Sequence, residues 1–367
     1  MRLAFKPCSL LFKIEIVLKQ IDILIVGDFP PATHTGISMV NALVCDILVG
    51  QNKIVQVIDE SAWAYRGIKR IFRYLFSSHF TLVKVLLSYK PKYVYLNIPL
   101  SFAGQMRLLI TCLIVKTYSH RSNLIGHIHR GDIKFWVIKS LVNKFILAVN
   151  LRLFNKVVVL SKKFEYDLLN YYPKTNSAVI PNTSLLEGFI SKGKPHYNNK
   201  FICISNIIRT KGIGDLVNAF SDTRLKNFHV TIVGNIYDRD FYDELIAIKS
   251  SNVEFITNTN RQAVAELLVN SYCLILPSWN EGQPLVILEA MSIGIPIIST
   301  NVGDIPDMVG SDYPFLFEPH DINMLIDRVL TFSNFEKKQE LSEQLLYRYS
   351  SNYSKHVFTK NILELFS

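Results

Sequence analysis

Hydrophobic positions along this chain fall into short apolar runs that alternate with helical patterns. Residues 21–26 (IDILIV) and 273–276 (CLIL) are almost continuously apolar, which is typical of strands buried on both faces of a parallel sheet. Between such runs, apolar residues recur every three or four positions, which predicts helices. This alternation favours an α/β protein built on doubly wound parallel sheets.

The alternation is interrupted by a polar stretch at residues 191–200 (SKGKPHYNNK), which we interpret as a link between two domains. Strands predicted before the link are 21–26, 54–58, 93–96, 124–128, 157–160 and 178–180, and a helix is predicted at 39–48. Strands predicted after it are 201–205, 228–233, 253–256, 273–276 and 295–299. Helices predicted there are 213–220, 242–249, 261–270 and 284–293, and the chain after Phe315 is largely helical.

We therefore expect two Rossmann-like domains, an N-terminal one over residues 1–190 and a C-terminal one over residues 198–349. The helical pattern over residues 350–367 is expected to pack back on the first domain. Two such domains facing one another would leave a cleft at the carboxyl ends of both sheets, where open α/β folds bind ligands.

Composition places the chain among globular proteins, since 49% of its 367 residues are hydrophobic and 19% are charged. Its five cysteines are scattered without paired spacing, which predicts reduced core thiols, a cytosolic chain and no metal site. Residues 238–240 form the one Asp-x-Asp pattern, which we interpret as the cap of a helix. Residues 1–20 do not have the pattern of a signal peptide, and their role stays open.

Charge is distributed unevenly between the halves. Residues 1–200 contain 27 Lys and Arg against 10 Asp and Glu, while the remainder has an acidic excess. The first half is therefore expected to face an anionic partner, either nucleic acid or the inner surface of a membrane. Residues 65–76 predict an interfacial amphipathic helix or, equally, a solvated helix packed on the sheet. The basic residues of this segment are Arg66, Lys69, Arg70 and Arg73.

The stretch over residues 278–304 joins a predicted strand to an unusually apolar helix. Glu289 is the only charge on that helix, and a buried carboxylate is costly unless it is hydrogen-bonded. It therefore predicts a partner rich in hydroxyls or amides, or alternatively a buried Lys or Arg. Glu281 precedes the helix, and Pro284 suits the first helical position. Since helix starts attract anions, the stretch predicts a sugar-nucleotide site.

Several motifs in a fixed order point to one family. Glu281 and Glu289 form an E-x7-E pattern (NEGQPLVILEAM), followed by Gly303 in NVGDIPDMV. The other motifs are GDFPPATHTGIS (27–38), HIHRGD (127–132), IPN (180–182) and ISNIIRTKG (204–212). Together they resemble the large retaining glycosyltransferase family four, whose members have the two-domain GT-B architecture. The resemblance covers nearly everything from residue 21 onward.

The resemblance implies roles for three charged residues of the second domain. Glu289 would bind the ribose hydroxyls of the donor nucleotide. Glu281 would lie by the donor sugar and its departing phosphate, and Lys211 would contact the leaving diphosphate. The alternatives without a functional role are an ordinary loop acid for Glu281 and a solvated turn for Lys211.

Further donor contacts are implied around the helix start. The amides from Gly282 through Leu285 would hold the diphosphate or the sugar, except that Pro284 has no amide hydrogen. Gln283 would read a hydroxyl of the donor sugar.

The comparison with the family also concerns four positions outside the helix start. Asn206 stands where relatives commonly have an arginine, and Arg209 is the candidate to supply the missing charge. Thr257, which is followed by Asn258, would lie near the base. Gly36 would let the backbone approach the diphosphate from the first domain, unless it is simply a turn glycine.

In the first domain, the resemblance places His129 on a loop facing the donor sugar. It is preferred to His127, which falls within the predicted strand. Arg130 and Asp132 are candidates for contact with the acceptor.

The resemblance implies a retaining, metal-independent hexosyltransferase-like enzyme without a cofactor, in which the leaving phosphate accepts the proton of the acceptor. The donor would be a UDP-, GDP- or dTDP-sugar. The acceptor would be a polyprenyl-linked glycan or a lipopolysaccharide core, in O-antigen, capsule or lipopolysaccharide synthesis. This function favours a cytoplasmic protein at the inner membrane surface over a nucleic-acid binder. The alternatives are a nucleotide-sugar 2-epimerase of the same architecture and an inactive basic membrane-binding module.

Overall fold

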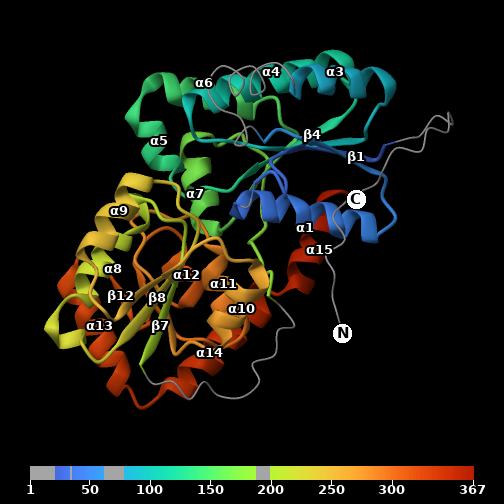
Figure 1. Ribbon diagram of the computed structural model, residues 1–367. Coiled ribbons are helices and arrows are strands. Elements are labelled where there is room, and N and C mark those ends of the chain that lie inside the picture. The colour runs from blue at the N-terminus through green and yellow to red at the C-terminus, as the bar shows by residue number, and fades with distance from the viewer. Residues whose placement is uncertain (1–20, 34, 62–77, 187–198) are drawn as a thin grey trace.

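The structure, a computed structural model, describes residues 21–33, 35–61, 78–186 and 199–367 (Figure 1). It contains two six-stranded sheets in which every paired strand is parallel, which confirms the predicted doubly wound α/β class. The predicted basic residues at 66, 69, 70 and 73 lie outside the described ranges, as do residues 1–20.

The first sheet has the strand order β2-β1-β3-β4-β5-β6. Its strands are β1 (Ile23–Gly27), β2 (Val55–Asp59), β3 (Tyr93–Asn97), β4 (Asn123–Ile128), β5 (Lys156–Val159) and β6 (Ser177–Val179). The helices described around it are α1 (Gly36–Gly50), α3 (Ser78–Ser88), α4 (Phe102–Tyr118), α5 (Ile133–Lys139), α6 (Leu141–Leu151) and α7 (Lys162–Tyr171).

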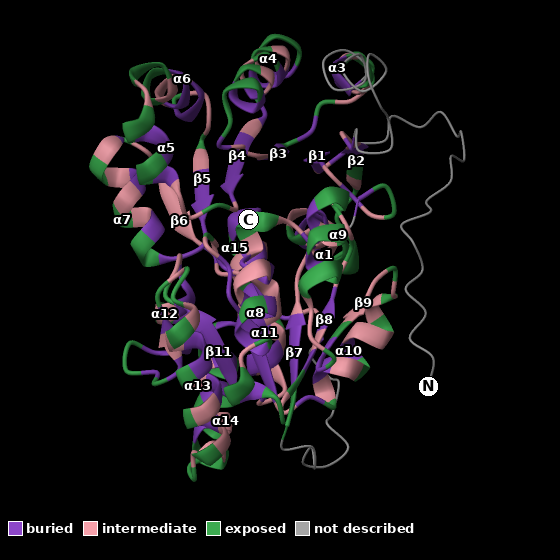
Figure 2. Ribbon diagram, turned by 60° about the vertical axis from the view of Figure 1, so that its left-hand side comes forward, coloured by how far each residue is buried: buried purple, intermediate pink, exposed green. Residues whose placement is uncertain are grey.

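Alternate side chains of the buried strands face the two helix layers of this domain. Leu24 and Val26 belong to the core beneath α3 to α7, whereas Ile23 and Ile25 belong to the core that faces α1. Because side chains of a strand point alternately to opposite faces, a run that is apolar at every position is covered on both sides. Figure 2 shows the buried colour mainly on the inner strands of this sheet, whereas the edge strands β2 and β6 are mostly intermediate in burial.

The second sheet has the order β12-β11-β10-β7-β8-β9. Its strands are β7 (Lys200–Ile204), β8 (His229–Val233), β9 (Val253–Ile256), β10 (Cys273–Leu276), β11 (Ile297–Thr300) and β12 (Leu316–Phe317). Its helices are α8 (Ile213–Phe220), α9 (Arg239–Ile248), α10 (Arg261–Val269), α11 (Leu285–Ser292), α12 (Ile305–Val309), α13 (Ile322–Asn334) and α14 (Lys338–Asn352), with 3₁₀ turns at Arg209–Lys211 and Thr223–Leu225.

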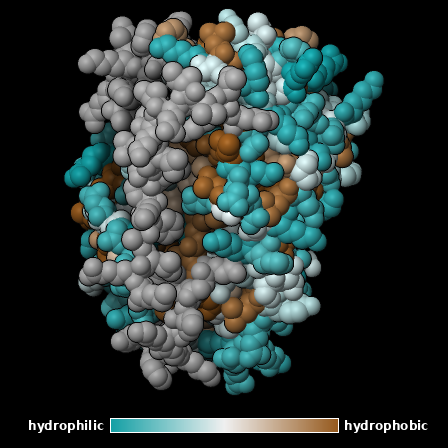
Figure 3. All heavy atoms as spheres, turned by 90° about the vertical axis from the view of Figure 1, so that its right-hand side faces the viewer, coloured by the Kyte–Doolittle hydropathy of each residue, from teal (hydrophilic) through white to brown (hydrophobic). Residues whose placement is uncertain are grey.

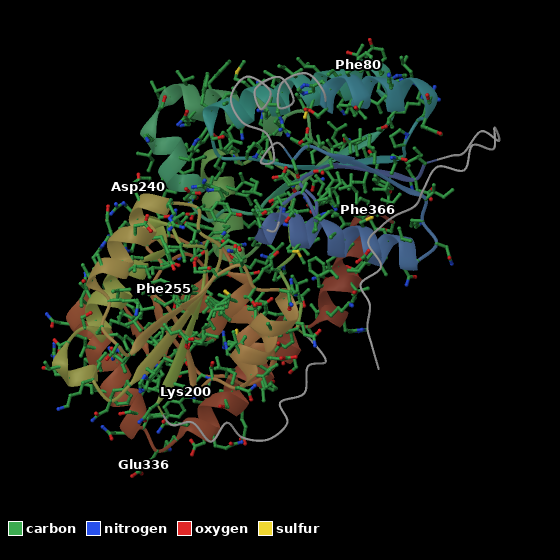
Figure 4. The ribbon with its side chains drawn as sticks, viewed as in Figure 1. Phe80, Lys200, Asp240, Phe255, Glu336 and Phe366 are labelled. Carbon is green, nitrogen blue, oxygen red and sulfur yellow. The ribbon has the colours of Figure 1, made fainter. Side chains whose placement is uncertain are left out.

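The last helix, α15 (Lys355–Leu365), leaves the second domain and lies on α1. Phe358 and Ile362 share the core that faces α1, and the hydroxyl of Tyr93 donates to the carbonyl of Ser367 at 2.7 Å. Figure 4 shows Phe366 at this junction, beside α1 and α15. The end of the chain thus returns from the second domain to the first.

Two sequence expectations of lesser weight are also settled. Of the cysteines, Cys45, Cys112, Cys203 and Cys273 are buried free thiols, as predicted for core residues. Asp238 caps α9 by accepting from the amide of Phe241 at 3.0 Å, which confirms the predicted helix cap. Across the described parts of the chain, no helix has both the length and the apolar character needed to cross a bilayer.

Candidate active site

The N-terminus of α11 lies at the carboxyl end of the second sheet, where a polar turn joins it to β10. The helix begins at Leu285, so Pro284 is its N-cap rather than its first helical residue as predicted. The missing amide therefore precedes the helical turn, and Leu285 supplies the first amide of the helix. Gly294 adopts φ of 71° just after the C-cap, as expected of a helix-ending glycine.

Lys211 and Glu281 form an ion pair at this helix start, with 2.7 Å between Nζ and Oε1. Gly212 explains why they meet. It adopts φ of 65°, and a Cβ atom there would lie 1.9 Å from the carbonyl oxygen of Pro277, so the turn carrying Lys211 packs directly on the end of β10. The amide of Trp279 also donates to Thr210 at 3.0 Å. The side chain of Glu281 is 10% exposed and that of Lys211 is 27% exposed, so the pair borders solvent.

Glu289 lies on α11 and accepts a hydrogen bond from Arg261, the first residue of α10, at 2.9 Å. The described partner is thus the alternative that the sequence left open, an arginine, rather than hydroxyls or amides. Burial raises the pKa of Glu289 to about 7, and the positive charge of Arg261 opposes that rise only in part. A carboxylate with so unfavourable an environment is a candidate for a functional group.

His129 faces this region from the first domain. It follows β4, and its Nε2 lies 3.1 Å from Oδ1 of Asn97. Its ring lies on that of His127, with 3.9 Å between centroids, and His127 in turn contacts the hydroxyl of Tyr95 through Nδ1 at 2.5 Å. Burial lowers the pKa of His129 to about 3, so its imidazole is neutral at physiological pH. His127 is fully buried within the strand, as predicted.

The two domains meet at Gly282. A Cβ atom on this glycine would lie 2.8 Å from the carbonyl oxygen of His129 and 3.3 Å from the amide of Gly131. The backbone between Glu281 and Gln283 therefore touches the loop that carries His129. Gly36, the first residue of α1, lies close to Leu285, since a Cβ atom on it would be 3.7 Å from Cδ1 of that leucine. The starts of two helices, one from each domain, thus border the same region.

Gln283 does not face open space in this structure. It is 5% exposed, and its Nε2 donates to the carbonyl of Leu160 at 3.3 Å and to Asp304 at 2.7 Å. Its Oε1 accepts from the amide of Asn182 at 2.5 Å, and Asn182 Nδ2 donates to the carbonyl of Gln283 at 3.1 Å. The bonds to Leu160 and Asn182 join the domains. In this arrangement both polar atoms of the side chain that was predicted to read a sugar hydroxyl are engaged with protein groups.

Arg209 is likewise occupied elsewhere. Its guanidinium group pairs with Glu244 at 2.6 Å, lies 4.0 Å from Asp238, and stacks over Phe241 at 4.7 Å. The charge expected to compensate for Asn206 is therefore directed toward α9 rather than placed beside Lys211.

The other predicted residues lie around the rim. Asn206 follows β7, and Thr257 follows β9 with a half-buried side chain. Arg130 donates through Nε to Oδ1 of Asp132 at 2.9 Å, at the base of α5. Within the described ranges, no three His, Cys, Asp or Glu side chains gather where they could hold a metal ion.

Sequence reasoning missed two residues that the structure places at the site. Arg261 pairs with Glu289, and Asp304 is 1% exposed with burial raising its pKa to about 6. Asp304 is the last residue of NVGD in the motif NVGDIPDMV. The sequence therefore offered it as a candidate partner for Gln283. Nothing in the local sequence marks Arg261, because its contact depends on how α10 and α11 pack.

We expect Gly282→Ala to destabilise the domain contact by about 1–3 kcal/mol, because the new methyl group would overlap backbone atoms that cannot rotate away. Gly214→Ala is the matched control, since a Cβ there would lie 3.7 Å from the ring of Phe241 and the helix gains from alanine. Urea unfolding of both variants measures the difference. Equal midpoints for the two would show that the domains do not touch here.

Comparison with known proteins finds similarity to one family, over the second domain. Residues 186–346 match the family model described as "Glycosyl transferases group 1". The chain is 32% identical over 133 residues to N-acetyl-alpha-D-glucosaminyl L-malate synthase of Bacillus anthracis, which is 35% of this chain and 34% of that protein. It is 25% identical over 151 residues to the capsular polysaccharide biosynthesis glycosyltransferase CapM of Staphylococcus aureus, 39% of each chain. The matches thus span little more than a third of these curated relatives.

The fold extends beyond the matched stretch. Sucrose-phosphate synthase from Thermosynechococcus elongatus superposes with a TM-score of 0.75 at 14% identity, over 94% of this chain and 98% of that one. At so low an identity this likeness establishes the fold alone. The chain therefore has the GT-B fold, and its second domain carries the sequence pattern of group 1 glycosyl transferases.

Proposed function

We propose that this protein is a retaining glycosyltransferase that moves a sugar from a nucleotide-sugar donor to a lipid-linked glycan in the synthesis of a bacterial surface polysaccharide. The observation that carries the proposal is the meeting, at one domain boundary, of the Lys211–Glu281 pair, the start of α11 and His129. The match to a glycosyltransferase of capsular polysaccharide biosynthesis supports the choice of a surface polysaccharide as the product.

The donor nucleotide is proposed to lie along the second domain, with its ribose at Glu289. One carboxylate oxygen of Glu289 accepts from Arg261, and the other would accept the ribose hydroxyls. Thr257, after β9, would lie by the base. A carboxylate that accepts from both a guanidinium and hydroxyls would be held ionised, which offsets the burial that raises its pKa.

The diphosphate is proposed to lie between Glu289 and Glu281, over the start of α11. The first amides of that helix, from Leu285 onward, and the positive end of its dipole would stabilise the anion. Lys211 would exchange its bond to Glu281 for the departing phosphate, and Gly36 would admit the phosphate to the start of α1.

In the transfer step, the bond between the anomeric carbon and the phosphate oxygen breaks while the acceptor hydroxyl attacks from the same face. The proton of the acceptor passes to the leaving phosphate, so that configuration is retained and a nucleoside diphosphate is released. Lys211 and the helix starts stabilise the charge that develops on the phosphate. His129, neutral because burial lowers its pKa to about 3, can hydrogen-bond a sugar hydroxyl without contributing charge.

Glu281 is not proposed to act as a nucleophile, because its carboxylate is already paired with Lys211. A double-displacement route would require a covalent glycosyl ester on a carboxylate. Mass spectrometry of protein trapped with donor alone tests this point. A glycosyl adduct on Glu281 would show that the reaction proceeds by double displacement and not by same-face attack.

Screening UDP-, GDP- and dTDP-sugars by thermal shift should identify one class of donor that stabilises the protein. A ligand at 100 times its dissociation constant adds about 2.7 kcal/mol of stability. The stabilising donor should also show slow release of its nucleoside diphosphate without acceptor, and faster release with a lipid-linked glycan. A 2-epimerase would instead change the sugar, and an inactive binding module would release no diphosphate from any donor.

A further inference from the structure

Four helices of the first domain lie side by side over one face of its sheet, in the order α3, α4, α6 and α5 (Figure 1). The sides of these helices turned away from the sheet carry eleven exposed large hydrophobic side chains. These are Phe80, Leu87, Phe102, Met106, Ile110, Leu113, Phe135, Ile138, Leu141, Val142 and Phe145, and we call this surface the outer face. Figure 4 shows Phe80 on it, at the edge of the molecule farthest from the second domain.

The exposure of the outer face is unusual in extent. Leu141 is 84% exposed, Phe135 79% and Phe145 71%. On α4, an outward stripe that includes Met106 and Ile110 stands opposite the inward stripe of buried residues, so this helix is apolar on both sides. Single exposed hydrophobics are ordinary, but a group of eleven on four neighbouring helices marks an interaction surface. Brown side chains also reach the surface along the upper edge of the molecule in Figure 3.

The charge of the outer face has one sign. Helices α3, α4, α5 and α6 contain no Asp or Glu, and residues 78–151 hold ten Lys and Arg against one acid, Asp132. The lysines on these helices are Lys84, Lys116, Lys134, Lys139 and Lys144. Hydrophobic side chains flanked by lysines are the composition of a surface that rests on anionic lipid.

We propose that the outer face docks on an anionic membrane surface, with its hydrophobic side chains at the boundary of headgroups and acyl chains and its lysines among the headgroups. This names the surface by which the proposed function would reach a lipid-linked acceptor. The argument itself rests only on α3 to α6. It therefore does not require the segment over residues 65–76, for which a membrane role was predicted from sequence.

A second copy of the chain is a poorer occupant. A two-fold interface places the same patch of both subunits together. It would set the lysines of one outer face against those of the other, and helices without a carboxylate offer no counter-charge. An anionic lipid surface provides both the negative charge and the apolar layer.

The outer face also borders a cavity lined in part by the loop that follows His129. This cavity, of about 560 Å³, includes Phe102 and Phe135 from the outer face, and Arg130 and Lys139 among its polar lining. Arg130 follows His129 directly in the chain. An acceptor whose lipid remains in the membrane could therefore present its phosphate at the cavity while its sugar reaches the domain boundary.

Cosedimentation of the full chain with vesicles tests the docking surface. We expect at least about tenfold tighter binding to vesicles containing phosphatidylglycerol than to phosphatidylcholine alone, because each basic residue near an anionic surface contributes about fivefold. The triple variant Ile110→Glu, Leu141→Glu, Phe145→Glu should lose at least about tenfold of that binding. All three side chains are exposed, so the fold should survive.

The matched control places the same three charges on the second domain, as Ile246→Glu, Ile248→Glu and Tyr347→Glu, which are also exposed. It should bind vesicles within about twofold of wild type. Equal binding by the outer-face variant and wild type would overturn the proposal. So would a wild-type dimer that the outer-face variant dissociates without any vesicle binding.

Nucleoside diphosphate release without vesicles separates this proposal from the proposed function. The outer-face variant should release the diphosphate at the wild-type rate, since none of its three residues lies at the domain boundary. If wild type binds vesicles but hydrolyses no donor, the proposed function fails and the docking surface stands.

Discussion

Replacing Lys211 with glutamine should lower kcat for nucleoside diphosphate release by about 10²–10³-fold, which is the typical loss when one charge-stabilising donor is removed from a transition state. Lys211 is the only cation described within ion-pair distance of Glu281, and its 27% exposure leaves it able to turn toward a phosphate. Stability should change by about 1 kcal/mol or less, since the pair borders solvent. Release at saturating donor, measured beside urea unfolding, separates the two effects.

Arg209→Gln is the matched control for that measurement. It removes the same charge two residues away in the same 3₁₀ turn, from a side chain engaged with Glu244. Its kcat should fall by less than about fivefold, because a loss of catalytic stabilisation requires contact with the reacting phosphate. If the two variants lose activity equally, Arg209 leaves Glu244 when the donor binds and supplies the charge that the sequence predicted for it. If neither loses activity, the diphosphate does not lie at this turn.

Much of the fold could be predicted because its determinants are local. Runs that are apolar at every position require cover on both faces, which predicted parallel sheets with helices on either side. The polar stretch at residues 191–200 predicted that there are two such sheets. Gly294 ends α11 and Asp238 caps α9 for reasons contained within a few residues of each. Local rules of this kind do not depend on contacts between the domains, so they can be applied to a single sequence.

The site could be predicted only in part, since its decisive contacts join distant segments. Arg261 reaches Glu289 across 28 positions and Gln283 reaches Asn182 across 101. The composition of α11 required a partner for Glu289 but did not distinguish an arginine from hydroxyls. In the same way, the outward stripe of α4 and its inward stripe have equivalent periodicity, so the sequence could not tell which one is covered.

Glu289→Gln should raise stability and weaken donor binding together, which is the second large effect expected. Burial raises the pKa of Glu289 from 4.5 to about 7, so between these values the native state binds a proton that the unfolded chain has released. The stability contributed by that proton is complete below about pH 4.5 and is lost as the pH rises through 7. Glutamine removes this loss, so the variant should be about 1–3 kcal/mol more stable than wild type at pH 8 and closer to it at pH 5.

The donor affinity of the same variant should fall by about 10²-fold, because hydroxyls lose their bonds to a charged acceptor. Glu266→Gln, an exposed change of equal charge on α10, should alter neither quantity. Urea unfolding at the two pH values and donor titration by calorimetry give both results. If Glu289 serves only as the ion-pair partner of Arg261, the opposite result is expected. The variant would then lose stability, because the guanidinium is left without a carboxylate, and it would bind the donor as wild type does. A gain in stability with a loss of affinity therefore distinguishes a carboxylate kept buried for ribose from one kept for its arginine.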